Sequence, residues 1–331
     1  MSNFIKANWR TLLVVSLIVV AYYIFFFISP TKATSMLNFS WSYAIPLVLA
    51  AMVGLVGERS GVVNIGIEGQ MLFSAFAGFF TAAYTGSLVA GIFAGILGGI
   101  LMGAFLAWTT VKWQMDQIIA GVVLNIVATG ITSFYYKQGQ ILPSTMQDFD
   151  VPILSEIPLL GPVFFRGGVF ALATIIVVML LQYMLFHTRW GLRTRAIGEY
   201  PNAADTAGID VIKMRLINVT LAGSLAGAAG AYLSMEATSS FERGFTAGRG
   251  FLALAILIFG AWHPLKVVAA ALFFGFSTSL AAQLQDDKII DIPQQFINIL
   301  PFVMTLIVLA TAAGRVRPPA ASGQPFVKGG S

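Results

Sequence analysis

The sequence contains no cysteine and only two histidines, His187 and His263. The first absence excludes disulfides and thiolate-bound metal centres, and two histidines at separate expected helix ends do not indicate a metal site. Charged residues are scarce as well: they make up 10% of the 331 residues, whereas a soluble domain carries about a quarter. Apolar residues reach 57%. Most of the surface is therefore expected to face lipid.

Unbroken apolar runs recur along the chain, each close to the roughly 20 residues that a membrane-crossing helix needs. A lipid-embedded backbone must satisfy its own hydrogen bonds, and unbroken rather than alternating runs favour helices over a barrel. The sequence predicts one all-α, polytopic transmembrane bundle over residues 1–331. We expect about ten spans, although eight or nine would also fit: 12–29, 43–57, 69–85, 89–108, 118–136, 167–186, 216–236, 251–262, 267–283 and 296–313. The segments 43–57 and 251–262 are short.

Basic residues set the expected orientation. They gather in residues 1–11, 187–215 and 314–331, whereas the long loop 137–166 carries only Lys137 and Arg166. Cytoplasmic loops are enriched in Lys and Arg, so we expect both termini, the loop 187–215 and the tail 314–331 to be cytoplasmic. The cations do not form one patch with interleaved aromatic residues, so the formal charge of +5 does not indicate a nucleic-acid partner.

Glycines recur every four residues in two of the expected spans: Gly91, Gly95, Gly99 and Gly103 in one, Gly223 and Gly227 in the other. Small-residue faces let two helices approach closely in lipid. The pattern predicts tight helix packing.

Two polar, glycine-rich segments interrupt the apolar pattern. Glu58, Arg59 and Gly66 in the first stand at one common offset from Glu242, Arg243 and Gly250 in the second. The charge rule places the two breaks near opposite membrane faces, which predicts an inverted, pseudo-symmetric repeat of residues 12–136 and 167–313 with two broken helices.

Ionisable side chains at membrane depth are costly unless they are paired or face a wet cavity. We therefore expect the polar residues of both breaks to shape a solute pathway or its gate: Glu58, Arg59, Asn64, Glu68, Gln70, Glu242, Arg243 and Arg249. Glu58 is expected to pair with Arg59. The alternative is that each break is an interfacial loop in which Glu and Arg neutralise each other.

The cytoplasmic loop contains a candidate docking helix. Pro201 suits the first turn of a helix, and Gly208 suits its end. Small residues lie between them, so this helix could enter a cleft in another protein; a solvated loop is the alternative. The residues concerned are Glu199, Tyr200, Pro201, Asn202, Ala203, Ala204, Asp205 and Gly208.

Three segments carry a family resemblance: GERSGVVNIGIEGQ at 57–70, GLRTRAIGEYPNAADTAGI at 191–209 and RVRPPA at 315–320. Together they resemble bacterial ABC permeases of the branched-chain amino acid and simple-sugar superfamily, and are most similar to the nucleoside-importer branch. The resemblance implies a permease subunit in the bacterial inner membrane that translocates a nucleoside-like solute. It further implies a second related permease subunit, a cytoplasmic ABC ATPase that receives the loop, and an extracytoplasmic binding protein. Gln70 departs from the pattern of such subunits and resembles their partner, so the subunit type stays open.

The chain has no Gly-x-x-x-x-Gly-Lys-Ser/Thr phosphate loop. It is therefore expected to be a transport subunit rather than an enzyme, without a cofactor of its own, and a partner would hydrolyse ATP. A sugar, branched-chain amino acid or vitamin is an alternative solute. Other classes are an ion-coupled secondary transporter and, from Ser277 with His263, an intramembrane protease. Trp41, Phe73, Phe76 and Phe251 could stack on a nucleobase.

Overall fold

The computed structural model describes residues 30–286, apart from positions 143, 145, 147, 148, 158 and 159, together with residues 299, 303 and 317–328. The expected span 12–29 and nearly all of 296–313 lie outside these residues. The helices are α2 (Pro30–Arg59), α3 (Ile67–Thr85), α4 (Leu88–Ala107), α5 (Gln117–Tyr135), α6 (Leu160–Phe164), α7 (Val169–His187), α8 (Arg189–Glu199), α9 (Pro201–Thr206), α10 (Val211–Ala231), α11 (Arg249–Phe259) and α12 (Pro264–Asp286). The π-helical turns η1 (Trp108–Lys112) and η3 (Tyr232–Ala237) extend α4 and α10, and the loop after α5 holds the 3₁₀ turn η2 (Leu154–Glu156) and the paired strands β1 (Phe149–Asp150) and β2 (Arg166–Gly167).

The predicted helical bundle is confirmed, but about ten spans are not. Six described helices are long and apolar enough to cross a membrane: Ala33–Arg59, Leu88–Lys112, Gln117–Tyr135, Val169–His187, Val211–Ala237 and Pro264–Gln283. Of the other expected spans, 69–85 falls in α3, which has 19 residues, and 251–262 is represented by α11, with 11 residues.

The expected span 43–57 is present, but its predicted shortness is wrong, because it is the second part of the 30-residue helix α2, of which Ala33–Arg59 is long and apolar enough to cross a membrane. The polar residues before it do not end the helix. Ser40, for example, donates its hydroxyl to the carbonyl of Met36 at 2.6 Å, so its polar group is satisfied within the helix itself.

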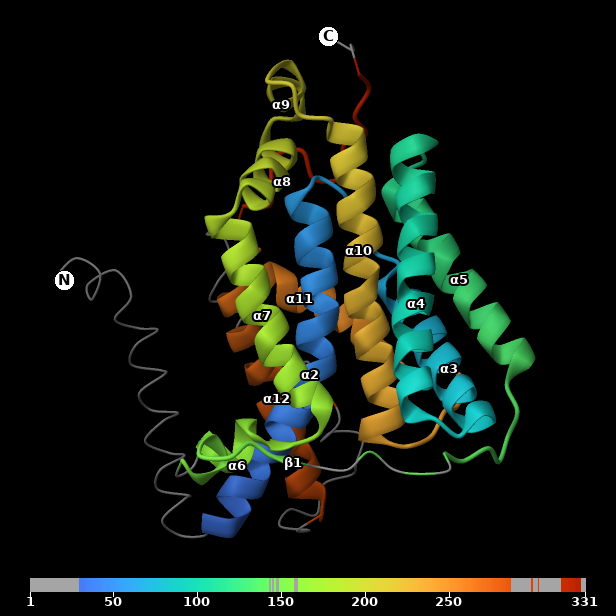
Figure 1. Ribbon diagram of the computed structural model, residues 1–331, viewed down its shortest axis with the longest axis vertical. Helices are drawn as coiled ribbons and strands as arrows, with labels where there is room; N and C mark the ends of the chain where they lie inside the picture. Colours follow the sequence, from blue (N-terminus) through green and yellow to red (C-terminus); the bar gives the residue numbers. More distant parts are fainter. Residues whose placement is uncertain are drawn as a thin grey trace, which may run out of the picture.

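Helix α2 occupies the centre of the bundle, where it packs against α10, α11 and α12 (Figure 1). Helices α3, α4 and α5 form one flank, and α7 lies on the other side of α2 (Figure 1). The glycine faces act as predicted. Gly99 of α4 lies directly against Gly223 of α10, and a Cβ on either residue would collide with the backbone of the other helix.

The two breaks enter the bundle from opposite ends. Helix α2 ends beside α8, since Gly198 packs on the carbonyl of Arg59. Helix α10 starts at that end, directly after α9, and runs to the far end, where Glu236 of η3 accepts a hydrogen bond from the Phe170 amide of α7 (Figure 1). Residues 60–66 therefore lead inward from the α8 end and residues 238–248 from the other. The duplication itself stays a prediction.

Candidate functional site

The first turns of the two helices that follow the breaks meet at Glu68. Its carboxylate accepts hydrogen bonds from the amides of Gly248, at 2.8 Å, and Gly250, at 2.6 Å, and from the hydroxyl of Thr246, at 2.6 Å. Gly250 allows this approach, because a Cβ there would collide with the Glu68 backbone. A carboxylate suits the positive end of a helix dipole. Glu68 of α3 thus caps α11, a contact between helices far apart in sequence.

Arg249 lies beside this junction. Its guanidinium Nη1 donates to the carbonyls of Phe245 and Thr246, at 3.2 and 3.3 Å, and the side chain is only half-buried. Glu68, Tyr43 and Tyr232 are close enough to interact with it electrostatically. The junction is therefore a polar cluster inside an apolar bundle, built from α2, α3, α10 with its η3 extension, and α11.

The start of α3 is held by two amide side chains of α5. Asn125 accepts a hydrogen bond from the Gly69 amide at 2.7 Å and donates one to the Ile65 carbonyl at 3.1 Å. Gln117 accepts a hydrogen bond from the Val63 amide at 2.7 Å. Sequence reasoning missed both residues. The available signal was Asn125 itself, an amide inside an otherwise apolar run, because such side chains bond between helices in lipid.

Asn64 and Gln70 come together in the fully buried part of the first break. The Asn64 amide nitrogen donates to Gln70 Oε1 at 3.1 Å. Asn64 Oδ1 and Gln70 Nε2 have no partner among the described residues. The pair therefore fixes the turn that leads into α3.

The expected pairing of Glu58 with Arg59 does not form, and both side chains bind Trp262 instead. The Trp262 indole donates to Glu58 Oε2 at 2.7 Å, while Arg59 Nε and Nη2 donate to the Trp262 carbonyl at 2.9 and 2.8 Å. Consecutive residues on a helix do not face each other, which explains the difference. These contacts tie the end of α2 to the turn between α11 and α12.

Glu242 and Arg243 lie apart from the other predicted pathway residues. Both are exposed, and the Arg243 guanidinium lies 5.4 Å from the ring centre of Tyr136. The eight residues expected to shape a pathway or its gate are thus divided among four places: the α2 end, the buried pair Asn64 and Gln70, the junction and the far rim.

A helix forms where the candidate docking helix was predicted, as α9 at one end of the bundle (Figure 1). Tyr200 is 72% exposed, and Asn202, Ala203 and Gly208 are exposed as well. Ala204 is 5% exposed and faces the protein interior. Glu199 and Asp205 are half-buried. Only one face of α9 is therefore available to a partner.

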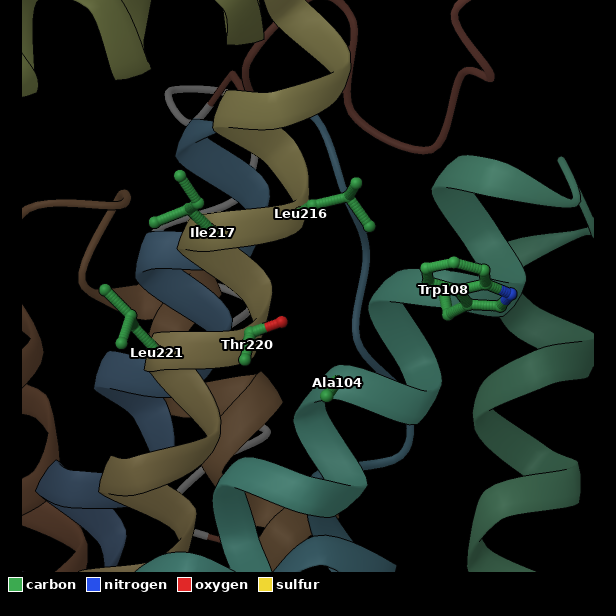
Figure 2. A pocket seen from close by; sticks show the side chains of 6 residues that line it. All are labelled: Ala104, Trp108, Leu216, Ile217, Thr220 and Leu221. Atoms are coloured by element: carbon green, nitrogen blue, oxygen red, sulfur yellow. The ribbon is translucent and has the colours of Figure 1, made fainter.

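A groove of about 340 Å³ lies between α4 and α10 (Figure 2). It is lined by Ala104, Trp108, Leu216, Ile217, Thr220 and Leu221. These side chains are almost entirely apolar, so the groove offers little to bind a polar solute.

The protease alternative fails on geometry. Ser277 lies within α12 and His263 directly precedes that helix, so the two are about 21 Å apart along one helix axis. Burial, together with Lys266 and Arg59, lowers the pKa of His263 below 6.5.

Of the aromatic residues expected to stack on a nucleobase, Trp41 is buried, Phe73 and Phe76 pack on hydrophobic clusters, and Phe251 is half-exposed.

Comparison with known proteins agrees with the predicted resemblance. Residues 36–309 match the family described as branched-chain amino acid transport system / permease component. The guanosine ABC transporter permease protein NupQ of Bacillus subtilis is 36% identical over 303 residues, which cover 87% of this chain and 94% of NupQ. The nucleoside ABC transporter permease protein NupC of Lactococcus lactis is 38% identical over 301 residues, 86% of this chain and 94% of NupC. The putative glucose ABC transporter permease protein TsgC13 of Haloferax volcanii is 32% identical over 258 residues, 76% of this chain and 78% of TsgC13. The chain therefore belongs to the branched-chain amino acid transport permease family and is the permease component of an ABC transporter.

Proposed function

We propose that this permease imports a nucleoside-like solute across the bacterial cytoplasmic membrane. A separate cytoplasmic ABC ATPase drives transport, a second related permease subunit completes the channel, and an extracytoplasmic binding protein delivers the solute. Both termini are cytoplasmic in this arrangement. The chain supplies the pathway and the docking helix, and no step of ATP hydrolysis.

The observation that carries the proposal is α9, a six-residue helix at one end of the bundle with an exposed face of small residues. It follows α8, whose Arg189, Arg193 and Arg195 suit the cytoplasmic side. An ion-coupled carrier has no ATPase to receive such a helix. Membership of the ABC permease family also favours an ATP-driven permease over an ion-coupled carrier.

The junction at Glu68 supports a pathway for a polar, uncharged solute. Glu68 already accepts three hydrogen bonds, whereas the half-buried guanidinium of Arg249 makes two among the described residues, both through Nη1. A partly accessible guanidinium at membrane depth is tolerated where it faces water or solute. Donor groups of this kind fit the ring nitrogens and carbonyls of a nucleobase, and the two nucleoside-type relatives favour that class over a sugar.

Uptake into proteoliposomes tests the proposal. The permease, its paired permease and the ATPase are reconstituted with the binding protein outside and ATP inside, and accumulation of radiolabelled guanosine is measured. We expect uptake that requires ATP and the ATPase and that unlabelled guanosine suppresses. Uptake driven by an ion gradient without ATP would overturn the ATP-driven mechanism. Labelled glucose is tested in the same way, because one relative is a putative glucose permease. Accumulation of glucose but not of guanosine would show that the solute is a sugar.

A further inference from the structure

Residues 317–328 form a non-helical segment at the end of the bundle that holds α8 and α9 (Figure 1). Two of its amides bind the last turn of α8: Ala321 donates to the Gly198 carbonyl at 2.9 Å, and Ala320 donates to Glu199 Oε2 at 3.2 Å. This is the turn from which the chain passes directly into α9. The segment therefore fixes the base of the docking helix.

Phe326 anchors the same segment in an apolar cluster that includes one residue of α9. Its side chain is 8% exposed and packs in one cluster with Ile197 of α8, Ala204 of α9 and Val211 of α10. Ala204 is the residue through which α9 faces the protein. A six-residue helix has little stability of its own, because isolated helices shorter than about 12 residues are marginal in water. The orientation of α9 thus depends on the apolar contact below it.

Arg215 of α10 links this segment to the first break. The side chain is 2% exposed, and Nη1 donates to the Gln324 carbonyl at 2.9 Å. Nη2 lies against Gly61, in the turn that follows α2, where a Cβ would collide with it. Gly61 has a φ of +89° that also favours glycine. One buried side chain therefore touches both the segment 317–328 and the turn that leads into α3.

We propose that residues 317–328 are a coupling brace, which holds α9 in position for the ATPase and moves with it as one body. The proposal rests on the function of α9 proposed above. A displacement of α9 would reach the first break in two steps: through the apolar cluster that contains Ala204 and Phe326, and through Arg215, which lies between Gln324 and Gly61. The brace adds a connection between the ATPase side and the Glu68 junction, besides the helix α10 itself and the contact of Gly198 with the Arg59 carbonyl.

The test compares Phe326→Ala, Phe326→Leu and Val327→Ala in the complete transporter reconstituted as above. Val327 is the matched control, because it is the next residue and is 53% exposed. Guanosine uptake and ATP hydrolysis are measured on the same vesicles. We expect Phe326→Ala to lower the solute moved per ATP by roughly tenfold, within the usual range of coupling between sites. Phe326→Leu, which keeps an apolar anchor, should retain most of the wild-type ratio of solute moved per ATP. Val327→Ala should match the wild type.

A second measurement keeps Phe326 intact, in case Phe326→Ala does not accumulate in the membrane. Spin labels on Thr206→Cys and Val327→Cys are specific, since the chain has no cysteine of its own. We expect one narrow distance that ATP does not change. A broad or ATP-dependent distance, or wild-type coupling in Phe326→Ala, overturns the brace. Loss of ATP-driven uptake in the wild-type complex would instead overturn the proposed function.

Discussion

Among single residues, Glu68 has the largest number of long-range hydrogen bonds described at the junction, with three donors from α11 and the turn before it. Glu68→Ala leaves two amides and a hydroxyl without their acceptor, and each such group costs about 1–3 kcal/mol when buried. Glu68→Gln keeps one acceptor oxygen and should lose less stability than Glu68→Ala. We expect the apparent melting temperature of the detergent-purified permease to fall in the order wild type, Gln, Ala.

Glu156→Gln is the control for this series, because Glu156 is exposed in the loop after α5 and the substitution removes the same charge. It should melt as the wild type does. If Glu68→Ala were equally stable, the contact between the two first turns would contribute nothing to the fold, and the junction could not serve as a fixed point in a pathway.

At the scale of elements, the contact between α4 and α10 depends on backbone approach at Gly99 and Gly223. Gly99→Ala forces the two helices apart, and such overpacking costs typically about 1–3 kcal/mol. Gly130→Ala is the matched control, since Gly130 lies in the apolar helix α5 and a methyl group added there would meet no atom within 4 Å. That change should be neutral or slightly stabilising, because Ala favours a helix over Gly by about 1 kcal/mol.

Thermal unfolding of both variants in the same detergent separates the two effects. Equal melting temperatures would show that α4 and α10 can separate without cost. The expected loss in Gly99→Ala alone would show that the glycine face is a structural contact, independent of transport.

At the scale of the whole molecule, a substitution in α9 affects either ATPase binding or the stability of the permease, depending on the face of the helix that carries it. Ala203 is exposed, so Ala203→Trp should leave the permease folded but prevent the ATPase from binding, and ATP-dependent uptake should fall to background. Ala204 is buried in the apolar cluster that contains Phe326, so Ala204→Trp should lower the melting temperature of the permease itself. Ser144→Trp, exposed at the opposite end, should change neither property. Co-purification of the ATPase with wild-type efficiency by Ala203→Trp would contradict α9 as its docking site.

The sequence by itself determined features that local chemistry encodes. Hydropathy predicted the helical bundle, the glycine period predicted the close face of α4, and Pro201 with Gly208 bounded α9. These signals depend on neighbours within a turn or two, so no long-range contact is needed to detect them. The family resemblance also came from contiguous motifs, and the comparisons confirmed it.

Only the tertiary structure decided which residue each polar group meets. Charge at membrane depth indicated that Glu58, Arg59 and Glu68 need partners, but not that these are Trp262 and the first turn of α11. The burial of Ala204 and its place in one apolar cluster with Phe326 were equally undetermined. Local periodicity fixes the face of a helix on which a side chain lies, whereas its partner depends on how distant segments pack. That packing is set by the bundle as a whole, since each buried donor must find an acceptor among helices that are remote in sequence.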